Sequence, residues 1–413
     1  MKKYGWGSAL LAGWMLMACT LKNRSSIERE ESAGGKKLKT EQPEGNLPVS
    51  GQTAAFPVEV SPRYAQGFRL TYGDGYILAD IQDPQNRESS GFRYALIPRR
   101  ETSATSSSEP EKLPPGIPSD YARIEIPIRS AICMTSLQLS NFIKLDAIDK
   151  VVGITSTRHL FNKEMNRRLE EGKTAKIGME GNFDTEVIMS MNPDIILVSP
   201  FKRGGYEAMK EVGIPLVPHL GYKELTPLGQ AEWIKFIGLL IGEEQAANER
   251  FDAIECRYNE LKGLTGAGKV TKRPVVFSGE MRGGHWYAVG GESFLARLFE
   301  DAGADYFLKE DTRSGGVVLD FETVYNQADH ADFWRIVNSF PGRFTYEALR
   351  AQDERYADFK AFKEKGIIYC NMKETPFYES MPTEPEVVLA DLLHIFHPHL
   401  LPRHRPVYYY RLP

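Results

Sequence analysis

The stretch IGMEGNFDTEVIMSMNPDIILV, residues 177–198, decides the fold class because it places a helix directly before a buried strand. Asp184 can cap the amino end of a helix whose apolar side chains recur at helical spacing. Pro193 then stops the helix, and the uninterrupted apolar run 195–198 is typical of a strand buried on both faces. Such a strand predicts a parallel sheet with helices on both sides.

The same alternation continues on both sides of this stretch. Short apolar strands are predicted at 124–128, 151–154 and 214–217, with helix patterns between them. A second region repeats the pattern, with predicted strands at 274–278 and 366–369 and predicted helices at 293–301, 321–328 and 387–396. We therefore expect an α/β fold of two lobes, each with a mainly parallel sheet flanked by helices.

Residues 226–263 predict one long helix between the two regions. Thr226 and Pro227 are a favourable helix start. Trp233, Phe236 and Leu240 continue an apolar stripe at helical spacing, although Gly242 could interrupt it. We expect this segment to act as a spine that joins the lobes.

The amino terminus carries an export signal. Two lysines precede an apolar run at 6–18, which is shorter than the roughly 20 residues that span a membrane. The run ends in Ala18-Cys19, which resembles a bacterial lipobox. Residues 1–19 are therefore predicted to be a lipoprotein signal peptide with Cys19 as the lipidated residue, so that the protein is exported and anchored at the periplasmic face of a bacterial membrane. The polar stretch 20–57 predicts a flexible tether.

A β-rich extension is expected at 58–118, because alternating apolar residues flank the turn at Gly73-Asp74-Gly75. The remaining boundaries predicted from the pattern are an N-terminal α/β lobe at 119–225, the spine helix at 226–263 and a C-terminal α/β lobe at 264–413.

Composition excludes several classes of protein. The formal net charge is -4, with no basic excess of the kind that nucleic-acid binding needs. With Cys19 lipidated, the remaining three of the four cysteines have no CxxC spacing, so no cysteine metal site and no resident cofactor are predicted.

Six segments in order resemble the iron-complex, haem and cobalamin periplasmic-binding proteins, and together they cover roughly residues 120–401. They are 148–155, 177–197, 231–238, 286–304, 319–334 and 390–398. The resemblance implies a monomeric solute-binding lipoprotein of an ABC importer, which is not an enzyme. It also implies an iron or cobalt chelate as the ligand, such as haem, a ferric siderophore or a cobalamin. The implied partners are a permease and its ATPase, and the positions that match the permease-docking glutamates are Glu186 and Glu322.

The ligand is expected in the cleft between the lobes, where loops follow the strand ends. The cleft candidates are Met134, Thr135, Arg158, His159, Met179, Glu180, Arg203, His285, Trp286, Tyr287 and Arg313. The loop at 283–287 is the most suggestive, because paired glycines permit close approach, aromatic rings can stack on a macrocycle and a histidine can ligate haem iron.

Other classes stay open. No GxSxG, HExxH or P-loop motif is present, but a chelatase-like enzyme acting on a tetrapyrrole would use a site such as His159 with Glu180. A carrier of free zinc or manganese is a further alternative, as is a surface adhesin. The histidines, however, gather at the carboxyl end, at 394, 397, 399 and 404.

Overall fold

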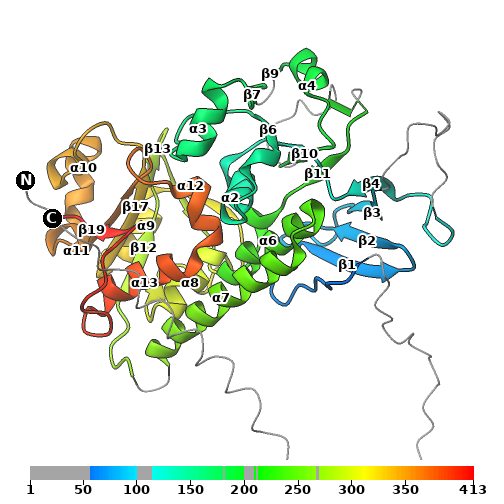
Figure 1. Ribbon diagram of the computed structural model, residues 1–413. Coiled ribbons are helices and arrows are strands. Elements are labelled where there is room, and N and C mark those ends of the chain that lie inside the picture. The colour runs from blue at the N-terminus through cyan, green and yellow to red at the C-terminus, as the bar shows by residue number, and fades with distance from the viewer. Residues whose placement is uncertain (1–55, 100–113, 180–181, 200–208, 211–212, 267–268) are drawn as a thin grey trace, which may run out of the picture. The chain divides into compact units, whose positions relative to one another are not determined.

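A computed structural model describes residues 56–99, 114–179, 182–199, 209–210, 213–266 and 269–413 (Figure 1). Cys19 and the predicted tether lie outside these residues. Among the described helices, none combines the length and the apolar character that crossing a bilayer requires.

The extension forms a sheet in the order β1-β2-β3-β4. Its strands are β1 (Phe68–Gly73), β2 (Tyr76–Ile81), β3 (Phe92–Pro98) and β4 (Ala122–Ile126). The predicted hairpin is confirmed, because Gly73 pairs with Tyr76 across a two-residue turn in which Gly75 has a φ of 78°. The strand expected to open the N-terminal lobe pairs instead with β3 as β4. The extension therefore reaches Ile126 rather than residue 118.

The N-terminal lobe contains a parallel sheet in the order β11-β10-β5-β6-β7. Its strands are β5 (Ala131–Cys133), β6 (Val151–Ile154), β7 (Ala175–Lys176), β10 (Ile195–Val198) and β11 (Leu216–Pro218). The helices are α2 (Ser136–Lys144), α3 (Lys163–Glu170) and α4 (Thr185–Met191), and a short hairpin pairs β8 (Gly178–Met179) with β9 (Asn182–Phe183). Along β10, Ile195 and Leu197 enter one apolar cluster, whereas Ile196 and Val198 enter another. Both faces of the sheet are therefore covered, as the apolar run predicted.

The C-terminal lobe contains a sheet in the order β15-β12-β17-β18-β19. Its strands are β12 (Val275–Ser278), β15 (Asp305–Tyr306), β17 (Phe333–Asn338), β18 (Ile367–Asn371) and the antiparallel β19 (Tyr410–Arg411). Its helices are α8 (Phe294–Asp301), α9 (Phe321–Ala328), α10 (Tyr346–Gln352), α11 (Lys360–Lys363), α12 (Phe377–Ser380) and α13 (Pro385–Phe396). A separate antiparallel sheet holds β13 (Glu280–Arg282), β14 (His285–Val289) and β16 (Gly316–Leu319).

The expected spine is not a single helix. Thr226 does cap a helix, but α6 (Pro227–Ile241) ends at Gly242, whose φ of 78° breaks the helical path before α7 (Glu244–Lys262). The ammonium of Lys235 lies 4.4 Å from the ring centroid of Phe251. In one straight helix these residues would be roughly 24 Å apart at 1.5 Å per residue. The two helices therefore fold back and pack side by side.

The extension is fastened to this helix pair. Phe68 packs edge-on against Trp233 with ring centroids 5.1 Å apart, and the blue strands in Figure 1 lie beside α6. Further along, the Tyr94 hydroxyl donates a 2.5 Å hydrogen bond to the backbone carbonyl of Leu216 at the edge strand β11. The extension is thus part of the packed fold.

Candidate functional site

The loops at the carboxyl ends of the parallel strands in the two lobes meet at His159. This residue follows β6 and has a φ of 64°, which turns the chain sharply after the strand. Its Nε2 lies 3.3 Å from Oγ of Ser339, which follows β17. The imidazole also hydrogen-bonds to the backbone of Met372, which follows β18. In α/β folds, ligands bind at such carboxyl edges.

The protonation of His159 reflects this position. Burial lowers the pKa of its imidazole, and the nearby cations Arg158 and Lys373 lower the pKa further. The lowered pKa favours the neutral ring, whose hydrogen-bond partners Ser339 and Met372 both come from the C-terminal lobe.

A small cavity of about 190 Å³ lies at the carboxyl ends of β5 and β6. The side-chain oxygen Oε1 of Gln138 accepts hydrogen bonds from the backbone N–H groups of Met134 and Thr135. The hydroxyl of Thr155 donates to the carbonyl of Met134, so the two loops support each other. The residues that line this cavity are Cys133, Met134, Thr135, Ser136, Leu139, Ile154, Thr155 and Ser156. The structure thus brings the predicted residues Met134 and Thr135 together at this edge.

Further contacts join the lobes beside His159. The backbone N–H of Phe161 donates a 3.0 Å hydrogen bond to the buried carboxylate of Glu379 on α12. Lys144 at the end of α2 pairs with Glu384 before α13 at 3.1 Å. Helices α2 and α12 lie side by side (Figure 1). The lobes are therefore in direct contact along this edge.

The profile of the periplasmic binding protein family matches residues 132–373, more than half of the chain. This chain belongs to the periplasmic binding protein family. The binding protein is 24% identical to an uncharacterized lipoprotein of Methanocaldococcus jannaschii over 86% of this chain and 84% of that one. A second uncharacterized lipoprotein of the same organism is 26% identical over 85% of this chain and 86% of that one.

Solved structures share the fold of this binding protein. A periplasmic haem-binding protein of Pseudomonas aeruginosa is 18% identical, with a TM-score of 0.52 over 66% of this chain and 93% of that one. The molybdate periplasmic binding protein of Haemophilus influenzae is 18% identical, with a TM-score of 0.52 over 67% of this chain and 88% of that one. These likenesses confirm the α/β fold with two lobes, and the family is one of substrate-binding proteins of ABC transporters.

The β13–β14 hairpin of the binding protein differs from the expected ligand loop. Gly283 and Gly284 have φ values of 56° and 85° and form its two-residue turn, so their freedom serves the turn. Trp286 is 0% exposed, and its indole N–H donates a 3.0 Å hydrogen bond to the carbonyl of Ser278. The prediction that Trp286 stacks on a ligand is therefore wrong for this structure, because the ring is part of the core. His285 and Tyr287 point to the opposite, exposed face of the strand.

The remaining predicted ligand residues are dispersed. Arg158 is exposed beside His159. Arg313 is engaged by its own loop, because its Nε donates to Asp311 at 2.9 Å. Met179 lies in β8, and Glu180 and Arg203 lie outside the described residues.

Both predicted docking glutamates are exposed in the first turn of a helix. Glu186 lies on α4 and Glu322 on α9, where Asp184 and Asp320 cap the helices. The side chain of Glu322 is 74% exposed and lies 3.6 Å from Arg355. The two lobes therefore present carboxylates at equivalent places.

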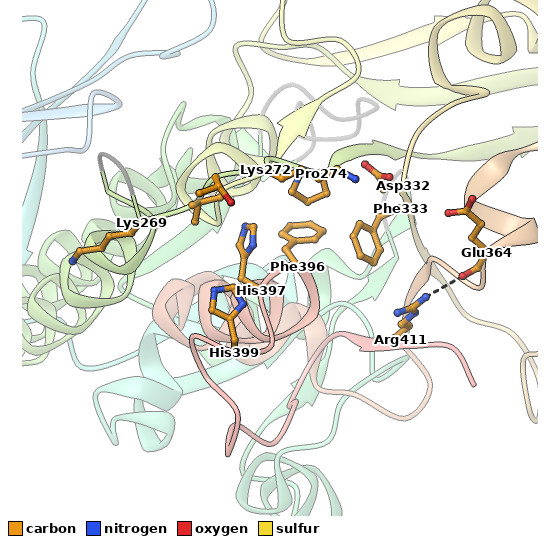
Figure 2. A pocket seen from close by; sticks show the side chains of 12 residues that line it. Lys269, Lys272, Pro274, Asp332, Phe333, Glu364, Phe396, His397, His399 and Arg411 are labelled. Atoms are coloured by element: carbon orange, nitrogen blue, oxygen red, sulfur yellow. Dashed lines mark hydrogen bonds between the residues drawn. The ribbon is translucent and has the colours of Figure 1, made fainter.

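Figure 2 shows a pocket of about 390 Å³ at the amino ends of β12 and β17, the edge of the sheet opposite to His159. Several charged groups that line this pocket are bound within the protein itself. Asp332 accepts hydrogen bonds from the N–H of Val275 and from Lys360, and Arg411 donates to the backbone carbonyl of Glu364. A groove of about 710 Å³ beside α8 is similar, since Arg273 pairs with Asp305 there.

The carboxyl-terminal histidines also have structural partners. His397 Nε2 lies 3.1 Å from the carbonyl of Gly303, and His404 Nε2 lies 2.6 Å from the buried carboxylate of Asp391. Within the described part of the chain, no group of three or more His, Cys, Asp and Glu side chains could hold a metal ion.

Sequence reasoning missed Ser339 and Lys373, which complete the junction around His159. The apolar run 333–337, interrupted only by Arg335, is a strand signal that would have placed Ser339 after a strand end. Lys373 follows the strand that was predicted at 366–369, so the same rule would have found it.

Proposed function

We propose that this protein captures a metal chelate, such as haem, a ferric siderophore or a cobalamin, at the junction of the two carboxyl edges and delivers it to an ABC permease with its ATPase. One observation carries the proposal. His159 of the N-terminal lobe and Ser339 of the C-terminal lobe lie 3.3 Å apart, so both lobes can contact one solute there.

An organic ligand is supported by the exposed face of the β13–β14–β16 sheet. Tyr287 pairs across the strands with Val318, and their side chains are 47% and 54% exposed. An exposed aromatic ring beside an aliphatic side chain suits a planar or macrocyclic ligand better than a bare cation. Haem is also what the similar protein of Pseudomonas aeruginosa is named for.

We further propose that Glu186 and Glu322 dock onto basic side chains of the permease. A carboxylate in the first helical turn is favoured by the helix dipole and stays available for a bidentate arginine contact. The exposure of both side chains supports this role.

The protein is also proposed to be exported and anchored through Cys19. The basic start, the apolar run and the Ala18-Cys19 pair support this assignment. The names of the two Methanocaldococcus jannaschii lipoproteins, which resemble this chain over most of its length, support it as well.

The test is a spectral titration of the full chain in detergent with haemin, cyanocobalamin and ferric siderophores. Saturable binding of at least one chelate is expected, with weaker binding by His159→Ala and Tyr287→Ala. His330→Ala is the control, because His330 is exposed and pairs only with Asp329 among the described acidic groups. If none of the chelates binds, the proposed function is wrong. If binding survives His159→Ala, the ligand does not sit at the junction, and if it survives Tyr287→Ala, the exposed sheet face does not contact the ligand.

A further inference from the structure

Two cations flank the contact between the lobes. Arg158 precedes His159 on the loop after β6, whereas Lys373 follows Met372 on the loop after β18. The imidazole of His159 hydrogen-bonds to Met372, so these two loops meet at one point. Both cations are exposed, and both act electrostatically on His159. Each lobe therefore places one positive charge beside His159.

These cations have no acidic partner within the described residues. The carboxylate of Glu379 is engaged elsewhere, because it is buried and accepts the backbone N–H groups of Phe161 and Asn162. Some other cations are paired, as with Arg273 and Asp305 in the groove beside α8 and Arg313 with Asp311. Each lobe thus places at the junction one exposed cation that has no acidic partner among the described residues.

The physical consequence is a preference for an anion at this point. Two like charges that face each other across a junction repel, and an anion between them would replace the repulsion with two attractions. A guanidinium can bind a carboxylate or phosphate in bidentate fashion, while an ammonium acts as a point charge. The hydroxyl of Ser339 adds a neutral donor at the same place.

We propose that Arg158 and Lys373, together with the His159–Ser339 pair, form an anion clamp that spans the two lobes, and that the solute carries carboxylate groups at this end. The inference rests on the proposed function, which it narrows from metal chelates in general to chelates with peripheral anionic groups. The Arg158 and Lys373 side chains select for anionic chelates, because a solute with carboxylate groups can pair with a cation from each lobe.

The experiment compares pairs of chelates of which only one member carries free carboxylates. Haemin, with two free propionates, is titrated against haemin dimethyl ester, and ferric citrate against the neutral ferrichrome. The full chain in detergent is compared with Arg158→Glu, Lys373→Glu and the double variant. Arg350→Glu on α10 is the control, because it makes the same charge change at an exposed position outside the junction.

The wild-type protein is expected to bind the anionic member of a pair more tightly. Each charge reversal should weaken that binding by about tenfold or more, in line with the coupling of close charge pairs. Binding of the neutral member should change by less than about twofold, since it makes no ion pair. Arg350→Glu should leave both affinities unchanged.

The outcomes separate the clamp from the proposed function. Equal binding of anionic and neutral chelates by the wild-type protein, or unchanged binding of the anionic chelate by the double variant, would overturn the clamp and leave the carrier function standing. No binding of any chelate would overturn both. Should the double variant fail to fold, Arg158→Gln and Lys373→Gln test the same point with neutral side chains.

Discussion

The carboxylate of Glu232 on α6 accepts a 2.6 Å hydrogen bond from the backbone N–H of Tyr64 in the extension. The N–H groups of Arg63 and Ala65 donate to the same carboxylate, and Lys235 pairs with it at 2.8 Å. Glu232 is 0% exposed. A single buried anion therefore holds three consecutive backbone groups of a segment that lies 167 to 169 positions away in the chain.

Replacing Glu232 with alanine is expected to destabilise the fold by about 3–5 kcal/mol, because it leaves buried N–H groups unpaired and the charge of Lys235 uncompensated. Urea unfolding followed by circular dichroism measures the loss. Glu249→Ala, at an exposed position of α7, should cost less than about 1 kcal/mol. A loss of similar size in both variants would mean that the extension is not held by this carboxylate.

The carboxyl-terminal tail, residues 407–413, is likewise held by one buried carboxylate, that of Asp391 on α13. This carboxylate is 0% exposed and accepts the N–H groups of Val407, Tyr408 and Tyr409. Asp391→Ala should therefore cost about 3 kcal/mol or more and release the tail. Limited proteolysis with chymotrypsin should then cut at Tyr408 or Tyr409, which are buried in the native protein. If these tyrosines stay protected in the variant, packing alone holds the tail.

Local patterns predicted much of the fold because the relevant forces act over a few residues. The strand at 195–198 and the helix at 321–328 have the predicted bounds. Both begin or end at strong signals, Pro193 before the strand and the capping carboxylate of Asp320 before the helix. The apolar residues of both elements must also be buried, which restricts how the strand and the helix can pack.

Other features depended on contacts that a local pattern does not contain. The helical stripe continues through Gly242, so periodicity alone did not reveal that α7 folds back on α6. The segment 283–287 was predicted as a ligand loop, whereas His285 and Trp286 belong to β14 and face opposite sides, and only the tertiary packing decides which side is the core. His159 and Ser339 are 180 positions apart, and only the packing of the lobes brings them together.

His219 should make the stability depend on pH. It is 4% exposed, lies 3.1 Å from Nδ2 of Asn141 and packs on Trp233. Burial lowers the pKa of His219 to about 3, so the ring is neutral in the native protein. As the pH falls below about 6.5, the unfolded chain binds a proton that the native chain does not, and stability is lost by about 1.4 kcal/mol per pH unit until the folded pKa is reached.

Unfolding free energies measured between pH 7 and pH 4 test this expectation. The difference between the wild-type protein and His219→Gln should shrink and then reverse as the pH falls, because glutamine takes up no proton. His330→Gln is the control, since His330 is exposed. A constant difference across this range would show that His219 does not titrate as a buried neutral ring.

The neighbouring aromatic residues Trp286 and Tyr287 should separate stability from binding. Trp286 stacks on Phe277 at a centroid distance of 6.0 Å and packs against Trp334 at 5.5 Å, so Trp286→Ala should cost about 3–5 kcal/mol through the cavity it leaves. Tyr287 is 47% exposed, so Tyr287→Ala should cost less than about 1 kcal/mol and yet weaken binding of a planar chelate by about tenfold. Thermal melts and haemin titrations of the two variants distinguish the roles. If the Trp286→Ala variant is stable but does not bind the ligand, the β13–β14 hairpin must rearrange when the solute binds. Only then could the buried indole contact the solute.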